Sequence, residues 1–302
     1  MKVDSEERLS LANASVHPGR TSAGGRFRIK ACFGIVGALL VIGAALCAAL
    51  APRLAPCDPN KIDLANRLAP PTFMQGDSPG GLLGKDSLGR DILSRTIYGA
   101  QVSMLVGFVT VFISSIVGTG LGLVAGYKGG IVDDIVMGVA DIIYVVPFLV
   151  LIIAITALVG GGTLQLILYL GFANWISFAR VVRGEALSIR EKEYVLAARA
   201  LGASDLRIMF RHILPNVFAP VIVIAALGAG SMILTESALS FLGLGVSPSI
   251  PSWGRMVSDA RDYIKVSWWP AVFPGLAIML VVLGINLFGD WLRDVLDPRL
   301  RI

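Results

Sequence analysis

Charged residues are scarce in this sequence of 302 residues: Asp, Glu, Lys and Arg make up 16% of it, whereas apolar residues make up 55%. A water-soluble domain usually contains about 25% charged residues. The composition therefore argues against a soluble protein and favours one that lies in a lipid bilayer. The formal net charge of +5 requires no nucleic acid partner, because basic residues gather on the cytoplasmic loops of membrane proteins.

Cysteine and histidine are also rare, with three and two residues. Cys32, Cys47 and Cys57 follow no disulfide or zinc spacing, and His17 and His212 are too few to form a metal cluster. We therefore expect no metal and no cofactor. The patterns GxxxxGK[ST], GxSxG and HExxH do not occur, so the chain is expected to be no enzyme, and any ATP hydrolysis belongs to partner subunits.

Long apolar stretches are what the sequence contains instead. A helix needs about 20 apolar residues to cross the hydrocarbon core. Six stretches approach or exceed that length: residues 31–51, 103–127, 142–162, 163–179, 217–244 and 270–288. The fourth is the shortest, and Glu236 interrupts the fifth. The pattern predicts an all-α polytopic membrane protein with about six transmembrane helices.

The distribution of Lys and Arg predicts the orientation of these spans. Most of the 26 basic residues fall in segments that lie inside if both termini are cytoplasmic, as the positive-inside rule requires. The expected parts are a cytoplasmic tail (1–30), a first transmembrane helix with an extracytoplasmic loop (31–102), a transmembrane core (103–288) with inner segments 128–141 and 180–216, and a cytoplasmic tail (289–302). A cleavable signal peptide is a weaker alternative, because the first apolar run exceeds the usual length of about 7–15 residues.

Two extramembrane segments have an amphipathic helical pattern. Apolar side chains of residues 88–97 fall on one face, and Asp91 stands four residues before Arg95, with which it would pair. Residues 253–266 repeat the pattern and precede two tryptophans that are typical of a membrane interface. We expect two helices on the outer membrane surface. Whether the second one also contacts a substrate-delivering partner stays open.

Small and polar residues inside the spans predict where two helices pack together and where a substrate passes. Gly118, Gly122 and Gly126, with Ser114 before them, form one stripe that lets another helix approach closely. Pro147 is expected to kink the third span and shape a central cavity. With Asn174 and the intramembrane acid Glu236, it forms the predicted substrate path. Glu236 could instead cap a break in the fifth span.

The segment 184–216 is predicted to be a compact cytoplasmic loop. It is rich in Ala and lacks Pro before Pro215, which favours helix on both sides of Gly202. Gly202 would end the first helix as a C-cap, Ser204 or Asp205 would cap the second, and Pro215 would close the unit. The result is a knob of two helices that projects into the cytoplasm.

This loop resembles the EAA loop of binding-protein-dependent ABC import permeases, in which Glu-Ala-Ala is followed by three residues, Gly, nine residues and Ile-x-Leu-Pro. The residues that match are Ala197, Ala198, Gly202, Leu214 and Pro215, whereas Leu196 stands at the Glu position and His212 at the Ile position. The resemblance implies that the loop docks on an ATPase. If the family's Glu forms an ion pair with the ATPase, Glu193 or Arg199 would have to replace it here. Arg199, Arg207 and Arg211 could pair with acids of the ATPase or be ordinary positive-inside residues.

Further stretches narrow the resemblance. They are GKDSLGRDILSRTIYGAQVS (84–103), GYKGGIVDD (126–134), DIIYVVPFLVL (141–151), ESALSFLGLGVSPSIPSWG (236–254) and GDWLRDVLDPRLRI (289–302). Over roughly residues 30–302 the chain is similar to the C-type subunit of the dipeptide/oligopeptide/nickel permease branch. This implies a type I ABC importer permease fold with a cytoplasmic coupling helix, in a bacterial inner membrane. The implied partners are a sister permease, two ABC ATPase subunits and an extracytoplasmic solute-binding protein, and no nucleic acid.

The function implied by the resemblance is ATP-driven import of di- or oligopeptides. Nickel chelates, glutathione and opines are alternative substrates for the same machinery. An ATP-independent carrier or channel is the alternative from another class, but it would need several buried charges, and Glu236 is the one evident. A membrane enzyme would need paired catalytic groups, which the sequence does not offer.

Overall fold

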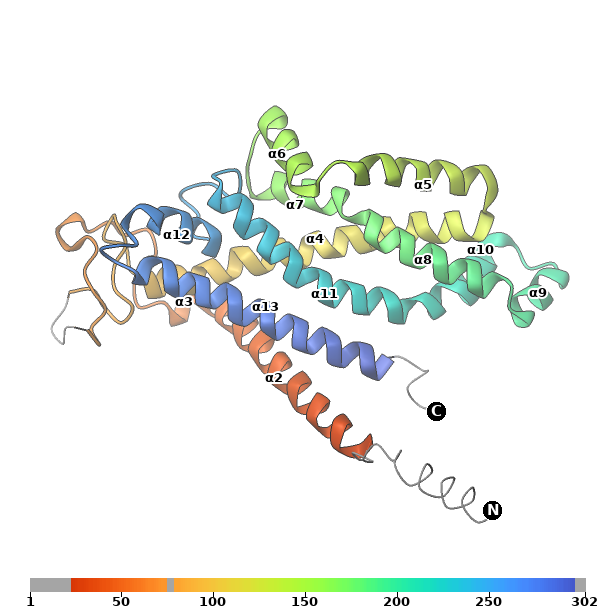
Figure 1. Cartoon of the computed structure of the whole chain (residues 1–302), viewed down its shortest axis with the longest axis horizontal. Coiled ribbons are helices and arrows are strands. Elements are labelled where there is room, and N and C mark those ends of the chain that lie inside the picture. Colours follow the sequence, from red (N-terminus) through yellow and green to blue (C-terminus); the bar gives the residue numbers. More distant parts are fainter. Residues whose placement is uncertain (1–22, 75–78, 297–302) are drawn as a thin grey trace, which may run out of the picture.

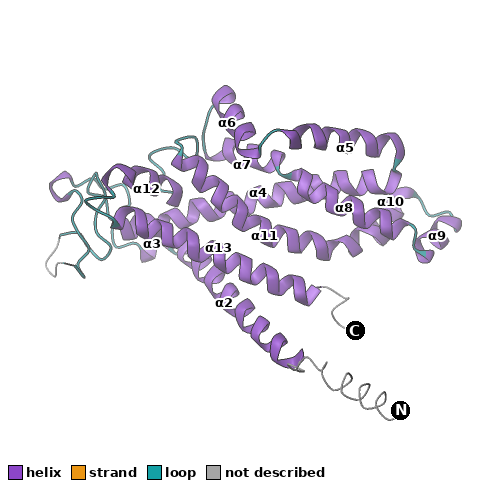
Figure 2. Ribbon diagram, viewed as in Figure 1, coloured by secondary structure: helices purple, strands orange, loops and turns teal. Residues whose placement is uncertain are grey.

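The computed structural model describes residues 23–74 and 79–296. Within these two ranges the regular elements are helices (Figure 2), most of which run along one long axis (Figure 1). Five helical runs are long and apolar enough to cross a membrane, and there are up to six spans if one bent pair is counted as a span. This confirms the predicted all-α polytopic fold with about six transmembrane helices.

The first and last spans lie side by side (Figure 1). α2 (Ala23–Ala49) begins ahead of the predicted start at residue 31, and α3 (Ala51–Leu54) follows it. A Cβ added at Gly37 of α2 would lie 2.6 Å from the backbone oxygen of Gly284, so the two backbones touch. α13 (Trp269–Leu296) carries Gly284 and extends into the predicted tail 289–302. The remaining parts of the two predicted tails, 1–22 and 297–302, lie outside the described residues.

The second span corrects the prediction of a separate surface helix at 88–97. η1 (Leu64–Asn66) is a short helical turn in the preceding loop, and α4 (Ile92–Lys128) is one helix of 37 residues. Asp91 caps α4, because its carboxylate accepts a hydrogen bond from the backbone N–H of Ser94. Arg95 forms its ion pair with Asp86 and not with Asp91. The apolar face of 88–97 therefore belongs mostly to the first turns of the span.

The third span is broken at Pro147, as predicted, but it begins earlier than expected. α5 (Gly130–Val145) and α6 (Phe148–Val159) are bent by 87° at the break. Val146 has the extended backbone that a following proline imposes (ψ 127°). The segment 128–141, expected to be a cytoplasmic loop, is mostly helix. Asp133 and Asp141 of this segment pair with arginines of a neighbouring helix, and a local sequence pattern does not reveal such pairs.

The fourth span consists of α7 (Thr163–Ala173) and α8 (Trp175–Arg190), which meet at Asn174. It extends beyond the predicted end at residue 179. The small-residue stripe of α4 packs against α8, as predicted: a Cβ added at Gly118 would lie 2.3 Å from the Trp175 oxygen, and one at Gly122 would lie 2.5 Å from the Ala179 oxygen.

The last elements complete the bundle. In chain order they are α9 (Glu193–Ala200), α10 (Asp205–Ile208), the π-helical turn η2 (Met209–Ile213), α11 (Leu214–Phe241), α12 (Trp253–Ala260) and η3 (Arg261–Tyr263). α9 and α10 lie at one end of the bundle, and α12 lies at the other (Figure 1). α12 confirms the helical part of the segment 253–266. The two candidate functional regions are therefore at opposite ends.

Candidate functional site

The loop 184–216 forms a helical corner at one end of the bundle (Figure 1). The N–H of Gly202 donates to the carbonyl of Arg199, and the N–H of Ala203 donates to that of Ala198. These two bonds define a Schellman C-cap, which ends α9. Gly202 has φ +79°, a conformation that side chains with a Cβ disfavour. The predicted knob of helix, corner and helix is confirmed.

Tyr127 ties this corner to the end of α4. Its hydroxyl donates a hydrogen bond of 2.7 Å to the carboxylate of Asp205. The guanidinium of Arg199 lies 5.4 Å from the centre of the Tyr127 ring, and its hydrogen bond with Tyr127 raises the pKa of Arg199 above the ordinary value. Arg190 adds a 3.0 Å bond to the carbonyl of Gly126. Sequence reasoning missed Tyr127, because its partner Asp205 is 78 residues away.

The tip of the corner is open to a partner and exposes leucine side chains. Leu196, Leu201 and Leu206 are 44%, 88% and 65% exposed. Leu196 stands where the EAA pattern has Glu. Ala197 and Glu193 are exposed too, and within the described part of the chain Glu193 forms no ion pair. A partner would therefore meet exposed leucines beside the exposed charged side chains of Glu193, Arg199 and Arg207.

Pro215 does not close the unit, contrary to the prediction. The π-helical turn η2 joins α10 to α11 without a loop, and Leu214 and Pro215 stand in the first turn of α11. Pro215 has no N–H to donate to the helical hydrogen-bond pattern, and the irregular turn η2 stands directly before this point. π-helical turns are rare and often mark functional positions. The corner is thus connected to a transmembrane helix through a helical turn with an irregular hydrogen-bond pattern.

The three residues of the predicted substrate path lie in different settings. Pro147 is exposed at the break between α5 and α6, and Asn174 is partly exposed at the break between α7 and α8. Glu236 is fully buried, and its carboxylate accepts hydrogen bonds from Ser103 at 3.0 Å and Ser240 at 2.7 Å. The bond from Ser103 ties α11 to α4. No hydrogen bond or ion pair in the described residues links the three, and their contact with substrate stays a prediction.

A network of ion pairs occupies the opposite end of the bundle. Arg90 contacts Asp86 at 2.7 Å and Asp259 at 3.3 Å, and Arg95 contacts Asp86 at 3.5 Å. Arg255 adds a contact of 2.9 Å to Asp259 on α12. Sequence reasoning missed this network, because Arg90 and Asp259 are 169 residues apart. It fastens α12 and the loop before α4 to each other.

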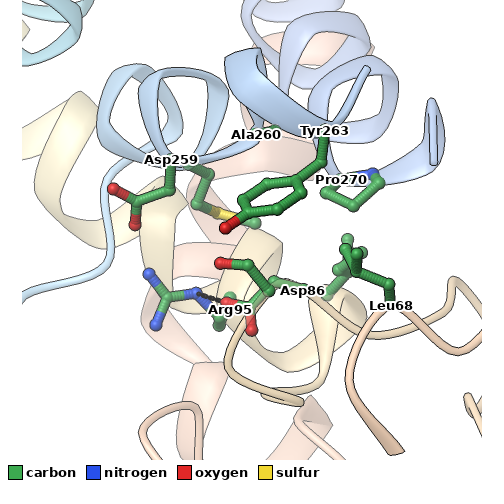
Figure 3. A pocket seen from close by; sticks show the side chains of 10 residues that line it. Leu68, Asp86, Arg95, Asp259, Ala260, Tyr263 and Pro270 are labelled. Carbon is green, nitrogen blue, oxygen red and sulfur yellow. Dashed lines mark ion pairs between the residues drawn. The ribbon is translucent and has the colours of Figure 1, made fainter. Parts of the chain in front are cut away.

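Figure 3 shows the residues that enclose a small cavity beside this network. Arg95, Asp86 and Tyr263 point into it, and its volume is about 10 Å³, close to the space that one water needs. In the loop nearby, Lys85 contacts Asp63 at 2.6 Å. Hydrogen bonds from Asn66 and Lys85 lower the pKa of Asp63 below its ordinary value. A larger open hollow of about 520 Å³ lies at the same end, and Arg90, Arg255 and Asp259 are among the residues that line it.

Known proteins resemble this chain over most of its length. Residues 118–302 match the family described as binding-protein-dependent transport system inner membrane component. A di/tripeptide transport system permease protein, DppC, of Pseudomonas aeruginosa is 43% identical over 265 residues, which are 88% of each chain. A glutathione transport system permease protein, GsiD, of Pectobacterium atrosepticum is 42% identical over 227 residues, which are 75% of each chain.

The fold also resembles a solved transporter. The structure described as an inward-facing conformation of the MetNI methionine ABC transporter matches with a TM-score of 0.56 and 19% sequence identity. The match covers 68% of this chain and 98% of the other. At this identity the match supports the fold alone.

Proposed function

Because the chain belongs to the family of binding-protein-dependent transport system inner membrane components, we propose that it is the transmembrane subunit of an ATP-driven importer of di- or oligopeptides. The exposed corner at Gly202, on a bundle of about six spans, is the observation that carries the proposal. A permease without a nucleotide-binding motif needs a surface on which a separate ATPase can act. The corner is such a surface.

The corner is the proposed docking site for that ATPase. Its aliphatic tip at Leu201 and Leu206 suits a cleft on the partner. Its Schellman cap and its bond to Tyr127 make it a unit that moves as one body. When the ATPases close on ATP, displacement of the corner reaches α4 through Tyr127 and α11 through η2. Such rigid-body movements shift a transporter between two states of access.

The orientation of the chain assigns each remaining partner to one side of the membrane. The corner faces the cytoplasm, and the start of α2 and the end of α13 point toward the same end of the bundle (Figure 1), which agrees with both termini inside. The sister permease forms a heterodimer with this chain in a bacterial inner membrane, and two ATPase subunits bind from the cytoplasm. An extracytoplasmic solute-binding protein delivers the substrate to the end that carries α12.

Short peptides are the proposed substrates because the relatives bear those names. The Pseudomonas protein is named for di- and tripeptides, and the Pectobacterium protein for glutathione, which is itself a short peptide with charged ends. Nickel chelates and opines remain alternative substrates of the same machinery.

Uptake by the reconstituted transporter tests the proposal. The chain is assembled with its sister permease, ATPases and binding protein in proteoliposomes, and entry of a labelled dipeptide is measured with and without ATP. We expect uptake that requires both ATP and the binding protein. Uptake that persists without ATP would indicate the carrier or channel instead.

A further inference from the structure

The outward face of α8 differs from those of the other transmembrane helices. α2, α4 and α13 expose large apolar side chains such as Leu39, Phe112 and Met279, which are 65%, 63% and 52% exposed. Lipid tails accept such faces. The exposed residues of α8 are Ser177, Arg180, Val181, Gly184, Glu185 and Ser188. A mainly polar face on a transmembrane helix is unsuited to lipid.

An ion pair lies at the edge of this face. Arg180 of α8 donates a hydrogen bond of 2.7 Å to the carboxylate of Asp141 on α5. The two side chains are 40% and 69% exposed. The guanidinium of Arg180 also lies 4.4 Å from the centre of the Tyr144 ring, and Tyr144 is 67% exposed. Three groups that recognise charge are thus accessible at one place.

A second pair between the same helices serves as a contrast. Arg183 contacts Asp133, whose side chain is only 13% exposed, and both nitrogens of its guanidinium fork bind the carboxylate. This bidentate pair holds α5 to α8, together with an apolar cluster of Ala140, Trp175, Ile176 and Ala179. The Asp141–Arg180 pair is more exposed than the Arg183–Asp133 pair.

The exposed pair joins two helices that belong to candidate transmembrane spans. Arg180 precedes the end of α8 at Arg190 by ten residues, or about 15 Å at a rise of about 1.5 Å per residue. Asp141 lies at a similar distance from the start of α5 at Gly130. The run Thr163–Arg190 has 28 residues and is about 42 Å long, so a hydrocarbon core about 30 Å thick that is centred on this run encloses Arg180. Ionised side chains at that depth face water or protein and not lipid.

The surface around the pair has open space. No atom lies within 4 Å of a Cβ added at Gly184 of α8 or at Gly138 of α5. Ser177 and Ser188 continue the small residues along α8 on the same side. The α8 side of this surface is thus polar and made of small residues, whereas the α5 side also exposes Ile135 and Ile142, so a passing solute meets both kinds of side chain.

We propose that this α5–α8 surface lines the water-filled translocation pathway and that Asp141 and Arg180 contact the charged ends of the peptide. The ammonium group of the peptide meets Asp141, and its carboxylate meets Arg180. A zwitterion can replace each partner of the pair, so neither side chain is left without an opposite charge while the peptide passes. Exposed ion pairs open at little cost. The proposal rests on the peptide-import function proposed above.

Cysteine labelling tests whether the surface faces water. In a chain with Cys32, Cys47 and Cys57 changed to Ser, single cysteines replace Ser177 or Gly184 in the assembled transporter. Phe112→Cys and Met279→Cys are the controls on apolar faces. We expect a charged thiol reagent to modify the first two and neither control. An active transporter in which positions 177 and 184 resist the reagent in both nucleotide-bound and nucleotide-free states would overturn the pathway assignment.

Coupled transport tests the contact with the peptide. We expect Asp141→Asn and Arg180→Gln each to lower the number of dipeptides imported per ATP about tenfold, the typical effect of losing a hydrogen bond to a charged group. ATPase stimulation by the binding protein is expected to persist in both. Asp133→Asn removes the same charge from the bidentate pair and is the matched control, with lower yield of assembled transporter but unchanged coupling.

The outcomes separate this inference from the proposed function. If the unaltered transporter imports no dipeptide, the proposed function fails. If it imports dipeptide and the Asp141 and Arg180 variants retain its coupling, the contact with the charged ends is wrong.

Discussion

At the scale of single residues, Gly202 and Glu236 illustrate two kinds of constraint. Gly202 needs its positive φ to form the corner, and the space around it within the chain is empty. A larger residue at Gly202 strains the backbone but meets no other atom of the chain. Any further loss of uptake that it causes therefore comes from a clash with a partner. Glu236 is fully buried and hydrogen-bonded to serines of α4 and α11. Its constraint comes from within the chain.

Gly202→Asp is expected to abolish ATP-driven uptake while the protein still inserts into the membrane. Gly202→Asn is expected to have the same effect, because Asn has the shape of Asp without its charge. Asn also tolerates positive φ, so the loss would not come from backbone strain. Copurification of the ATPase subunits and uptake are the measurements. Gly243→Asn is the matched control, since Gly243 has φ +81° and open space at the opposite end of α11. Loss with Asp alone would mean that charge and not shape governs docking.

Glu236→Ala is expected to lower the stability of the protein by about 1–3 kcal/mol, because it removes the acceptor of buried serine hydroxyls. Glu236→Gln keeps an acceptor and is expected to cost less. Thermal unfolding in detergent compares the two. If Gln preserves stability but uptake is lost, Glu236 contacts the substrate after all.

At the scale of elements, the contact between α4 and α8 depends on small residues over two turns. Gly118, Gly122 and Gly126 each lie so close to α8 that an added Cβ would come within 2.7 Å of its backbone oxygens. Gly120 is on the same helix, and nothing lies near its Cβ position. The stripe was predictable from spacing alone, because a helix places residues four apart on one face.

Gly122→Leu is expected to separate α4 from α8 and to lower the yield of folded protein severely. The Leu side chain would overlap the backbone of Ala179, and the packed helices cannot absorb that volume without moving. Gly120→Leu makes the same change toward open space and is expected to fold normally. Size-exclusion profiles of the two variants give the comparison, and equal profiles would contradict the packing argument.

At the scale of the whole molecule, the two ends of the bundle differ: one carries the proposed docking corner, and the other is cross-linked by ion pairs. The corner with its aliphatic tip lies at one end, and the ion pairs of Arg90, Arg95 and Arg255 hold the other together. Helices α4 and α11 connect the two, because each carries contacts at both ends. Movement imposed at the corner therefore reaches the outer end through whole helices and not through loops.

An even number of spans places both ends of the chain on one side of the membrane. Tags fused to the two ends are expected to resist protease added outside spheroplasts and to be cut after permeabilisation. The prediction depends on α5 and α6 acting together as one span. A tag that is cut from outside at one end only would show that the bent pair enters and leaves on the same side.

Local pattern was sufficient for much of this protein. Apolar runs separated by charged loops predict the membrane location and the number of spans, because burial of about 20 residues in hydrocarbon leaves few alternatives. Gly202 and Pro147 predict the corner and the break, because their backbone limits are intrinsic to the residues. Composition and short sequence spacings are enough to predict the spans, the corner and the break, without knowledge of contacts between distant residues.

The placement of α5 was decided by the tertiary structure. Asp133, Asp134 and Asp141 make its sequence read as a loop, yet it is a helix of 16 residues packed beside α8. Asp133 and Asp141 pair with Arg183 and Arg180, which lie 50 and 39 residues away in the chain. Opposite charges on two helices stabilise each other only when folding brings the helices together, and no local sequence pattern shows that proximity.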